Sequence, residues 1–211
     1  MGLNPIVRLS PDLVTRCQCL GAYRVERYAL GFNPGSRALS SHGAESDPEL
    51  QGRSVMAECA VCRYLKINPE RLNWTGASDC GFDFEFCGLR FDIKMTKRHS
   101  HYLIWPVNKR GIFDIEPFDA LILVKQDFPD FEIAGWLTKN EFAALHREAD
   151  ERHVLATGTW YVHESALHPP GLLFDWRMDL PASGDPLWRA LAQYKASRPD
   201  MITQQKEMSY A

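Results

Sequence analysis

The sequence lacks several patterns that would assign a class of function at once. Its longest aliphatic run, Ala120 to Val124, is far too short to cross a membrane, and its first residues lack the basic-then-apolar pattern of a signal peptide. It contains neither the G-x-x-x-x-G-K phosphate loop nor the G-x-S-x-G nucleophile elbow. We therefore expect a cytoplasmic protein with no membrane partner and no intrinsic ATP motor.

The sequence also lacks an overall excess of positive charge that would attract nucleic acid. Its 211 residues carry a formal net charge of −3, with 24 basic and 27 acidic side chains. The basic residues are nevertheless unevenly placed, because residues 86–110 contain six Lys or Arg and one acid, Asp92. A local field of this sign suits a phosphate backbone, although a charge run by itself is more often a solvated surface. Its position beside Asp92-x-Lys94 favours the phosphate interpretation.

The composition is that of a globular protein with a buried core, with 45% hydrophobic and 24% charged residues. Residues 31–52 are rich in Gly, Ser, Pro and Asp, which is typical of a loop. We therefore expect one globular unit, in which residues 1–50 form an N-terminal arm and loop packed on a core domain that spans residues 51–211.

The most informative stretch runs from Asp79 to Thr96, DCGFDFEFCGLRFDIKMT. Two segments in it, one on each side of Cys87-Gly88, alternate strictly between apolar and charged residues. Such alternation places successive side chains on opposite faces of a strand, and a short link containing glycine joins two strands into a β-hairpin. With a two-residue loop, residues 84–86 pair with residues 91–89, and the hairpin has one apolar and one charged face.

The charged face of this hairpin is predicted to bring like charges together. The same loop places Glu85 opposite Arg90, which is a favourable pair, and Asp83 opposite Asp92. Two carboxylates about 5 Å apart repel by roughly 3 kcal/mol at an effective dielectric constant near 20. A divalent cation turns this repulsion into a ligand set, because hard cations take carboxylate oxygens. Lys94, on the same face, would lie beside the metal and could orient or deprotonate water.

The order of these residues resembles the PD-(D/E)XK nuclease superfamily, also called the restriction-endonuclease-like fold. In that family an acidic residue begins one strand, a D/E-x-K triplet lies on the next, and a preceding helix often carries a glutamate. Here Asp83 is followed nine residues later by Asp92-Ile93-Lys94, and a predicted amphipathic helix over residues 51–66 carries Glu58. The sequence departs from the family pattern at Phe82, where the family tends to have proline.

The resemblance implies an α/β fold with a central mixed sheet flanked by helices, as in small phage or prophage nucleases. It implies metal-dependent hydrolysis of phosphodiester bonds, with DNA as the expected substrate and RNA as the alternative. Asp83, Asp92 and the backbone carbonyl of Ile93 would hold Mg²⁺ or Mn²⁺. Lys94 would position the attacking water, and Glu58 would complete the metal shell or hold a second ion.

The basic residues near the triplet are expected to bind the nucleic-acid backbone; they are Lys97, Arg98, His99, Lys109 and Arg110. Members of the family often dimerise because cutting two strands needs two sites, so a homodimer is a further expectation of the resemblance.

Several alternatives stay open on the sequence alone. Asp79 rivals Asp83 as a metal ligand, and the facing geometry of the hairpin favours Asp83. His99 and His101 could supply two zinc ligands on one strand face. A nuclease-like domain can also serve as a binding module for nucleic acid or protein without cleaving anything, because function depends on the site and not on the fold.

Six cysteines stand at positions 17, 19, 59, 62, 80 and 87. Cys17-x-Cys19 with Cys59-x-x-Cys62 could supply four thiolates for zinc, and the resemblance adds an iron–sulfur cluster as an alternative, since some members of the nuclease family carry one. Cys59 and Cys62, however, fall inside the predicted helix, whereas metal-binding cysteines usually lie in turns. We therefore expect small buried thiols in a reducing compartment.

The rest of the chain predicts further strands and helices around the hairpin. Residues 118–126, which contain the apolar run ALILV, are expected to form a buried central strand. Thr138 and Glu141 form a capping box that opens a helix. The other expected elements are a strand or short helix over 22–30, a continuation of the sheet over 99–105, a strand over 132–137, a late edge strand over 160–163 and a terminal helix over 185–194.

Overall fold

The computed structural model describes residues 4–29, 47–69, 72, 81–86 and 89–173. Asp79, Cys80, Cys87 and the terminal helix predicted over 185–194 lie outside the described residues. The strands and α-helices are β1 (Ile6–Arg8), α1 (Pro11–Ala29), α2 (Pro48–Tyr64), β2 (Phe84–Phe86), β3 (Leu89–Lys97), β4 (Tyr102–Trp105), β5 (Ala120–Asp127), β6 (Asp130–Thr138), α3 (Lys139–Leu145), β7 (Arg147–Glu148) and β8 (Trp160–His163).

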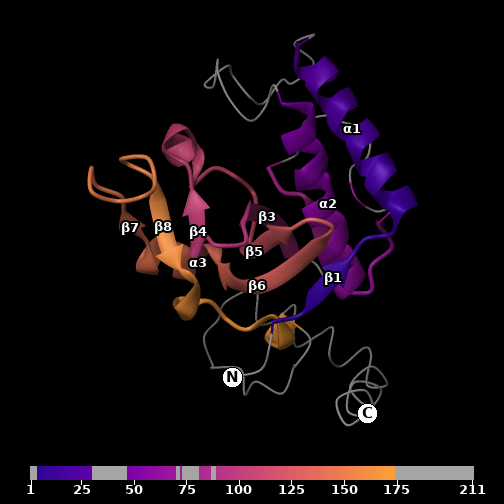
Figure 1. The fold of residues 1–211 in the computed structure, drawn as a ribbon. Helices are drawn as coiled ribbons and strands as arrows, with labels where there is room; N and C mark the ends of the chain where they lie inside the picture. The colour runs from indigo at the N-terminus through magenta and orange to yellow at the C-terminus, as the bar shows by residue number, and fades with distance from the viewer. Residues whose placement is uncertain (1–3, 30–46, 70–71, 73–80, 87–88, 174–211) are drawn as a thin grey trace.

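Five strands form one mixed sheet in the order β1-β6-β5-β3-β2. In this sheet β3 and β5 run parallel, while the other neighbouring pairs are antiparallel. The helices α1 and α2 pack on one face, and a second sheet, in the order β4-β8-β7, packs on the other together with α3 (Figure 1). The predicted α/β class, with a central mixed sheet flanked by helices, is confirmed.

β5 lies in the middle of this arrangement and is buried on both faces. Ala120, Ile122 and Val124 belong to the cluster beneath α2, whereas Leu121 and Leu123 belong to the cluster beneath the second sheet. All five residues are completely buried. A strand buried on both faces needs a continuous apolar run instead of an alternating one, so the sequence ALILV forms the central strand that it predicts.

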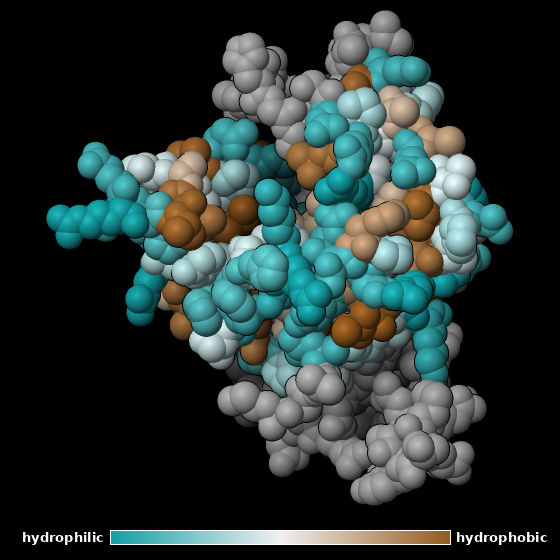
Figure 2. All heavy atoms as spheres, viewed as in Figure 1, coloured by the Kyte–Doolittle hydropathy of each residue, from teal (hydrophilic) through white to brown (hydrophobic). Residues whose placement is uncertain are grey.

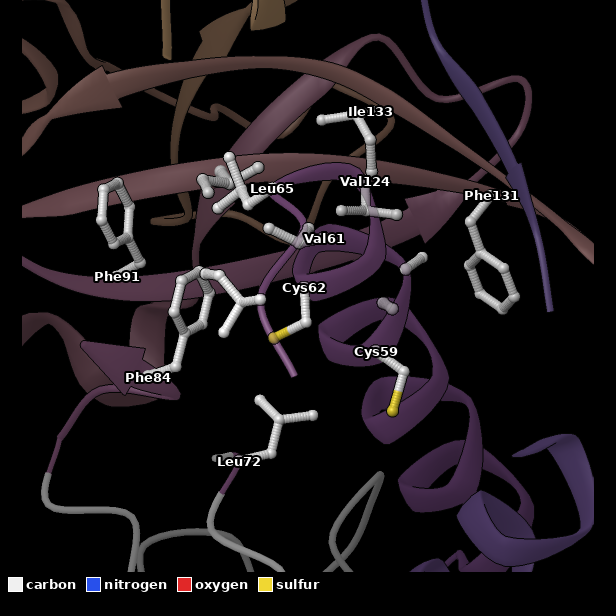
Figure 3. Packing of buried hydrophobic residues seen from close by; sticks show 14 of the residues in the cluster. Cys59, Val61, Cys62, Leu65, Leu72, Phe84, Phe91, Val124, Phe131 and Ile133 are labelled. Atoms are coloured by element: carbon white, nitrogen blue, oxygen red, sulfur yellow. The ribbon is translucent and has the colours of Figure 1, made fainter. Parts of the chain in front are cut away.

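The first cluster attaches the hairpin to α2, as Figure 3 shows. Cys62 of α2, with Leu65 just beyond the end of that helix, lies near Phe84 of β2 and Phe91 of β3. The rings of Phe84 and Phe91 stack with their centroids 5.3 Å apart. Complete burial of one such side chain stabilises a fold by about 1.5–3 kcal/mol. The hairpin is therefore held firmly against the helix that carries Glu58.

Both N-terminal helices differ in length from the sequence prediction. α2 begins at Pro48, three residues earlier than predicted, because the Asp47 carboxylate accepts hydrogen bonds from the N–H groups of Glu49 and Leu50 at 2.9 and 3.3 Å. Proline suits the first helical position that follows such a cap. α1 has 19 residues and is much longer than the strand or short helix predicted over residues 22–30.

Two predicted strands belong to the second sheet and not to the first. β4 follows a turn after β3 and pairs antiparallel with β8, from Tyr102 opposite His163 to Trp105 opposite Trp160. The expectation that residues 99–105 extend the main sheet was therefore wrong. β8 was also wrongly predicted as an edge strand, since β7 pairs with its other side.

The strand β6 and the capping box of α3 follow their sequence patterns. The Thr138 hydroxyl accepts the N–H of Glu141 at 3.1 Å, and the Glu141 carboxylate accepts the N–H of Thr138 at 2.9 Å. The second carboxylate oxygen of Glu141 lies 2.7 Å from Nε2 of His168. This contact ties the segment that follows β8 to the start of α3.

The helices α1 and α2 approach each other most closely at two glycines. A Cβ atom built on Gly21 would lie 2.3 Å from the backbone nitrogen of Gly52 and 2.7 Å from the carbonyl oxygen of Pro48. Real Cβ atoms do not approach backbone atoms so closely, so only glycine at position 21 allows the two helices to pack at this separation.

We expect Gly21→Ala to lower the free energy of unfolding by about 1–3 kcal/mol, because the added methyl group forces the two helices apart. Gly111→Ala is the matched control, since a Cβ atom there meets nothing within 4 Å. The control should change stability by no more than about 0.5 kcal/mol. Urea unfolding of both variants measures the difference, and equal stabilities would contradict the packing that we describe.

Candidate functional site

The register of the predicted hairpin is confirmed. Phe84 pairs with Phe91, Glu85 with Arg90 and residue 86 with residue 89. The charge of Glu85 acts favourably on Arg90, but the hydrogen bonds of the Arg90 guanidinium go to another carboxylate. That guanidinium makes two hydrogen bonds, each 3.0 Å long, to the carboxylate of Asp119, which also accepts the backbone N–H of Arg90. Asp119 therefore fixes the start of β3 against the start of β5.

Asp83 lies one residue before β2 and is not the cross-strand partner of Asp92, so this part of the prediction was wrong. Its backbone N–H donates to the carbonyl of Phe91 at 2.8 Å. Its side-chain Oδ2 accepts the backbone N–H of Ile93 at 2.6 Å. The N–H and C=O of a strand residue point to the same side of the strand. The carbonyl of Ile93 therefore points to the side on which the Asp83 carboxylate lies.

The Asp83 carboxylate is held in surroundings that disfavour its charge. Burial raises the pKa of Asp83 well above the ordinary carboxyl range, and the negative charges of Glu58 and Asp92 raise it further. The N–H of Ile93 and the ammonium of Lys94 act in the opposite direction but with smaller effects. The predicted acids Asp83, Asp92 and Glu58 therefore come close enough to interact electrostatically.

Asp92 and Lys94 form an ion pair on the face of β3 that is turned to the second sheet. Nζ of Lys94 lies 2.6 Å from Oδ2 of Asp92, and the two side chains are only 17% and 14% exposed. The same Nζ lies 4.5 Å from the ring centroid of Trp105, which is buried in β4. Trp105 thus belongs to the buried core and supplies a cation–π contact to the lysine.

Glu58 is buried and not solvated, with 4% of its surface exposed. The Arg24 guanidinium of α1 donates to both of its carboxylate oxygens, at 3.0 and 3.3 Å. Arg24 did not emerge from the sequence, because it lies 34 residues before its partner. The pair forms only when α1 and α2 pack together, and no local sequence pattern predicts that contact.

The predicted backbone-binding residues divide into two groups. Lys97 and His99 are exposed at the turn between β3 and β4, whereas Lys109 is half-buried in the segment after β4. Arg98 pairs with Asp127, while Arg110 donates to both oxygens of Glu148 at 2.9 Å. The charges of Arg98 and Arg110 are therefore partly neutralised within the protein.

The cysteines behave as the sequence predicts where the structure describes them, except for Cys19, which is exposed. Cys17 of α1 and Cys59 of α2 are fully buried with their Sγ atoms 3.6 Å apart. Burial, and then the charges of Glu58 and Asp83, raise the pKa of the Cys62 thiol to about 12. A thiol that stays protonated is a poor metal ligand, because metals bind the thiolate.

The donor chemistry of the site fits Mg²⁺ or Mn²⁺. The Asp83 carboxylate and the Ile93 carbonyl share one side of β3, and Asp92 adds a third oxygen donor beside them. Within the described ranges, no three side chains of the His, Cys, Asp or Glu types form a ready group for a metal. Two of the acids already have a basic partner: Lys94 pairs with Asp92, and Arg24 pairs with Glu58. A bound cation would share these carboxylates with the basic side chains.

We expect Asp83→Asn to stabilise the protein at neutral pH in the absence of divalent ions, by on the order of 1 kcal/mol. Because the folded-state pKa is raised, the stability that Asp83 contributes is fully present below about pH 4 and is lost as the pH rises through the folded-state value. Asparagine keeps an oxygen that can accept the N–H of Ile93.

Urea unfolding between pH 4 and pH 8 measures this effect. The advantage of the variant should shrink toward the acidic end, and Asp114→Asn, at an exposed position, should show no such trend. A variant that is less stable than the wild type at pH 8 would contradict the electrostatic description of Asp83.

Searches against protein-family models, curated proteins and solved structures found no match for this chain. No helix within the described ranges is both long and apolar enough to span a membrane.

Proposed function

We propose that this protein is a divalent-metal-dependent nuclease that hydrolyses phosphodiester bonds, with DNA as the first expected substrate. One observation carries the proposal: two carboxylates and a lysine converge on three consecutive residues of β3. The Asp83 carboxylate binds the backbone of Ile93, and the side chains of Asp92 and Lys94 flank that residue as an ion pair. The PD-(D/E)XK pattern in the sequence points to the same residues.

In this proposal, Asp83, Asp92 and the Ile93 carbonyl hold one Mg²⁺ or Mn²⁺ ion. A bound ion of this kind supplies a Lewis acid for the scissile phosphate and lowers the pKa of a coordinated water. The raised pKa of Asp83 supports this assignment, because it shows that the surroundings destabilise the ionised carboxylate. A bound cation would stabilise that charge.

Lys94 provides an N–H donor and a positive charge for the phosphate that is being attacked. In the structure its ammonium rests on Asp92 and on the Trp105 ring. The buried ring restricts where the lysine can move, so its charge stays near the carboxylates when Asp92 binds a cation. A donor held in advance at the place where negative charge develops is an effective source of catalysis.

Glu58 is the third acid of the site, and Arg24 fixes its position from α1. Its negative charge adds to the attraction of the site for a cation, and it completes the ligand set or holds a second ion when Arg24 yields one of its two hydrogen bonds. Lys97 and His99, both exposed at the end of β3, contact the nucleic-acid backbone.

A binding module without cleavage is the second candidate, and the pairing of the charges favours it. Lys94 neutralises Asp92, and Arg24 neutralises Glu58, so the cluster is satisfied in part without any metal. Cleavage assays separate the two candidates.

We expect Lys94→Ala to lower the rate of DNA cleavage in Mg²⁺ or Mn²⁺ by at least about 100-fold, because the donor beside the phosphate is lost. Linear, supercoiled and single-stranded DNA are incubated with wild-type and variant protein, with metal or with EDTA. Arg152→Ala, at an exposed basic residue outside the acidic cluster, is the control and should cleave within about threefold of wild type.

Circular dichroism and thermal unfolding confirm that both variants are folded. Cleavage that needs metal and disappears in Lys94→Ala supports the nuclease. Cleavage that persists in Lys94→Ala would overturn the site assignment, and a wild-type protein that binds DNA but cleaves no substrate with either metal would favour the binding module.

A further inference from the structure

A second polar cluster lies between the two sheets, at the far end of β4 from Trp105. Nζ of Lys125 in β5 lies 2.6 Å from Oε2 of Glu164, and the lysine side chain is only 7% exposed. The other carboxylate oxygen of Glu164, Oε1, lies 2.6 Å from Nδ1 of His101. The His101 side chain is 52% exposed. The buried Lys125 and the partly exposed Glu164 thus form a support for an imidazole at the surface.

Removing a lysine from water costs free energy, and the ion pair that it forms often does no more than offset that cost. Stability alone therefore does not explain why a lysine is buried here. A buried partner that fixes the orientation of a histidine ring is a common feature of sites in which that ring contacts a ligand. His101 and Trp105 are four steps apart along the chain, or about 13 Å in an extended strand, and the Trp105 ring contacts the lysine of the proposed catalytic site.

The hydrogen bonds fix which nitrogen of the His101 ring carries the proton. Burial raises the pKa of Glu164, but the hydrogen bonds from Lys125 and His101 outweigh it, so that the pKa lies below its ordinary value. The carboxylate is therefore ionised and can only accept. Nδ1 of His101 must donate to it, which leaves a lone pair on Nε2 of the neutral ring. In its neutral form, His101 is therefore a hydrogen-bond acceptor at the surface.

The neighbouring His163 has the opposite arrangement. Its Nδ1 accepts the backbone N–H of Ser165 at 3.2 Å, so the proton of the neutral ring is on Nε2. The Ser165 hydroxyl also lies 2.9 Å from the same nitrogen. His163 pairs across the sheet with Tyr102, whose ring contacts it edge-on with centroids 5.6 Å apart. At the surface, His163 is therefore a hydrogen-bond donor.

The two rings lie side by side, with centroids 6.1 Å apart and planes 25° from parallel. They come from β8 and from the residue before β4, two strands that Figure 1 shows next to each other. An acceptor beside a donor does not suit a metal held by two histidines, because only His101 offers a lone pair. It does suit a group that presents a donor next to an acceptor.

A ribonucleotide presents such a pair, since its 2′-hydroxyl can donate and the adjacent phosphate oxygens accept. DNA lacks the hydroxyl, which is the group that lets proteins distinguish RNA from DNA. The exposed Lys97 and His99 in the turn before His101 add basic groups beside the cluster, and the one acid within it, Glu164, is already paired.

We propose that His101 and His163 form a ribonucleotide-binding subsite, in which Nε2 of His101 accepts the 2′-hydroxyl and Nε2 of His163 donates to the neighbouring phosphate. The subsite rests on the proposed function that the protein binds nucleic acid, and it adds a preference for RNA over DNA at this position. Lys125 and Glu164 are positioning residues that set the tautomer of His101.

The test is a binding measurement in EDTA, on the Lys94→Ala background, so that no strand is cut. Fluorescence anisotropy compares three oligonucleotides of one sequence: RNA, 2′-O-methyl RNA and DNA. RNA should bind about tenfold more tightly than both others, which corresponds to one hydrogen bond. The 2′-O-methyl strand is the sharpest probe, since it keeps the ribose oxygen and loses only the donor.

His101→Phe should lower the affinity for RNA to that for DNA and leave the affinity for DNA within about twofold, while Glu164 keeps its bond to Lys125. His146→Gln, at a histidine held by Phe142 and Trp160 outside the cluster, is the control and should keep the RNA preference. Thermal unfolding confirms that each variant is folded.

Equal affinity for the three strands, a preference that survives His101→Phe, or no binding of any strand would each overturn the subsite. The nuclease proposal fails on a different readout, namely metal-dependent cleavage and its loss in Lys94→Ala. An RNA preference that depends on His101 in a protein that cleaves nothing would keep the subsite and reject the nuclease.

Discussion

The structure depends on the complete burial of β5 between two apolar clusters. Its alternate side chains pack against α2 on one face and against the second sheet on the other. β3 pairs with β5 over seven residues, from Phe91 to Lys97, and therefore also lies between the two layers. The charged side chains of β3 then lie among packed elements and are only partly exposed to water. This constraint brings Asp92, Lys94 and the nearby Asp83 close together in partly desolvated surroundings.

Partial burial explains why almost every charge in this region has a specific partner. Asp92 has Lys94, Glu58 has Arg24, and Arg90 has Asp119. An unpaired charge at such depth costs several kcal/mol, whereas a paired one that also keeps its hydrogen bonds can be accommodated. Asp83 is the exception that bears on function, since its carboxylate accepts the backbone N–H of Ile93 while burial and its acidic neighbours raise its pKa. A cation would relieve this imbalance, which is the physical basis of the proposed function.

Local patterns predicted the elements whose signal lies within a few residues. The hairpin register, the central strand and the capping box all follow from alternation, an apolar run or a side chain three residues away. The position of Asp83 did not follow, because the pleat of a strand cannot be extrapolated past the point at which the strand ends. Asp83 leaves the ladder and turns its carboxylate to the backbone of Ile93.

The contacts that complete both sites join residues far apart in the chain, and no window of sequence contains them. Arg24 and Glu58 are 34 residues apart, Lys125 and Glu164 are 39 apart, and His101 and Glu164 are 63 apart. For the same reason the sequence indicated that 99–105 and 160–163 are strands but not that they pair in a second sheet. These long-range pairings depend on how the helices and the two sheets pack against one another, and that packing is known only from the folded structure.

Calorimetric titration of Mn²⁺ into the wild-type protein and into Asp92→Asn tests the central claim most directly, because it asks whether the acidic cluster on β3 is a cation site. The account predicts saturable binding to the wild-type protein at neutral pH, with at least a tenfold loss of affinity in Asp92→Asn and a fold that survives the substitution. Binding of equal strength in both proteins, or no binding to either, would contradict the assignment of Asp83, Ile93 and Asp92 as the ligands.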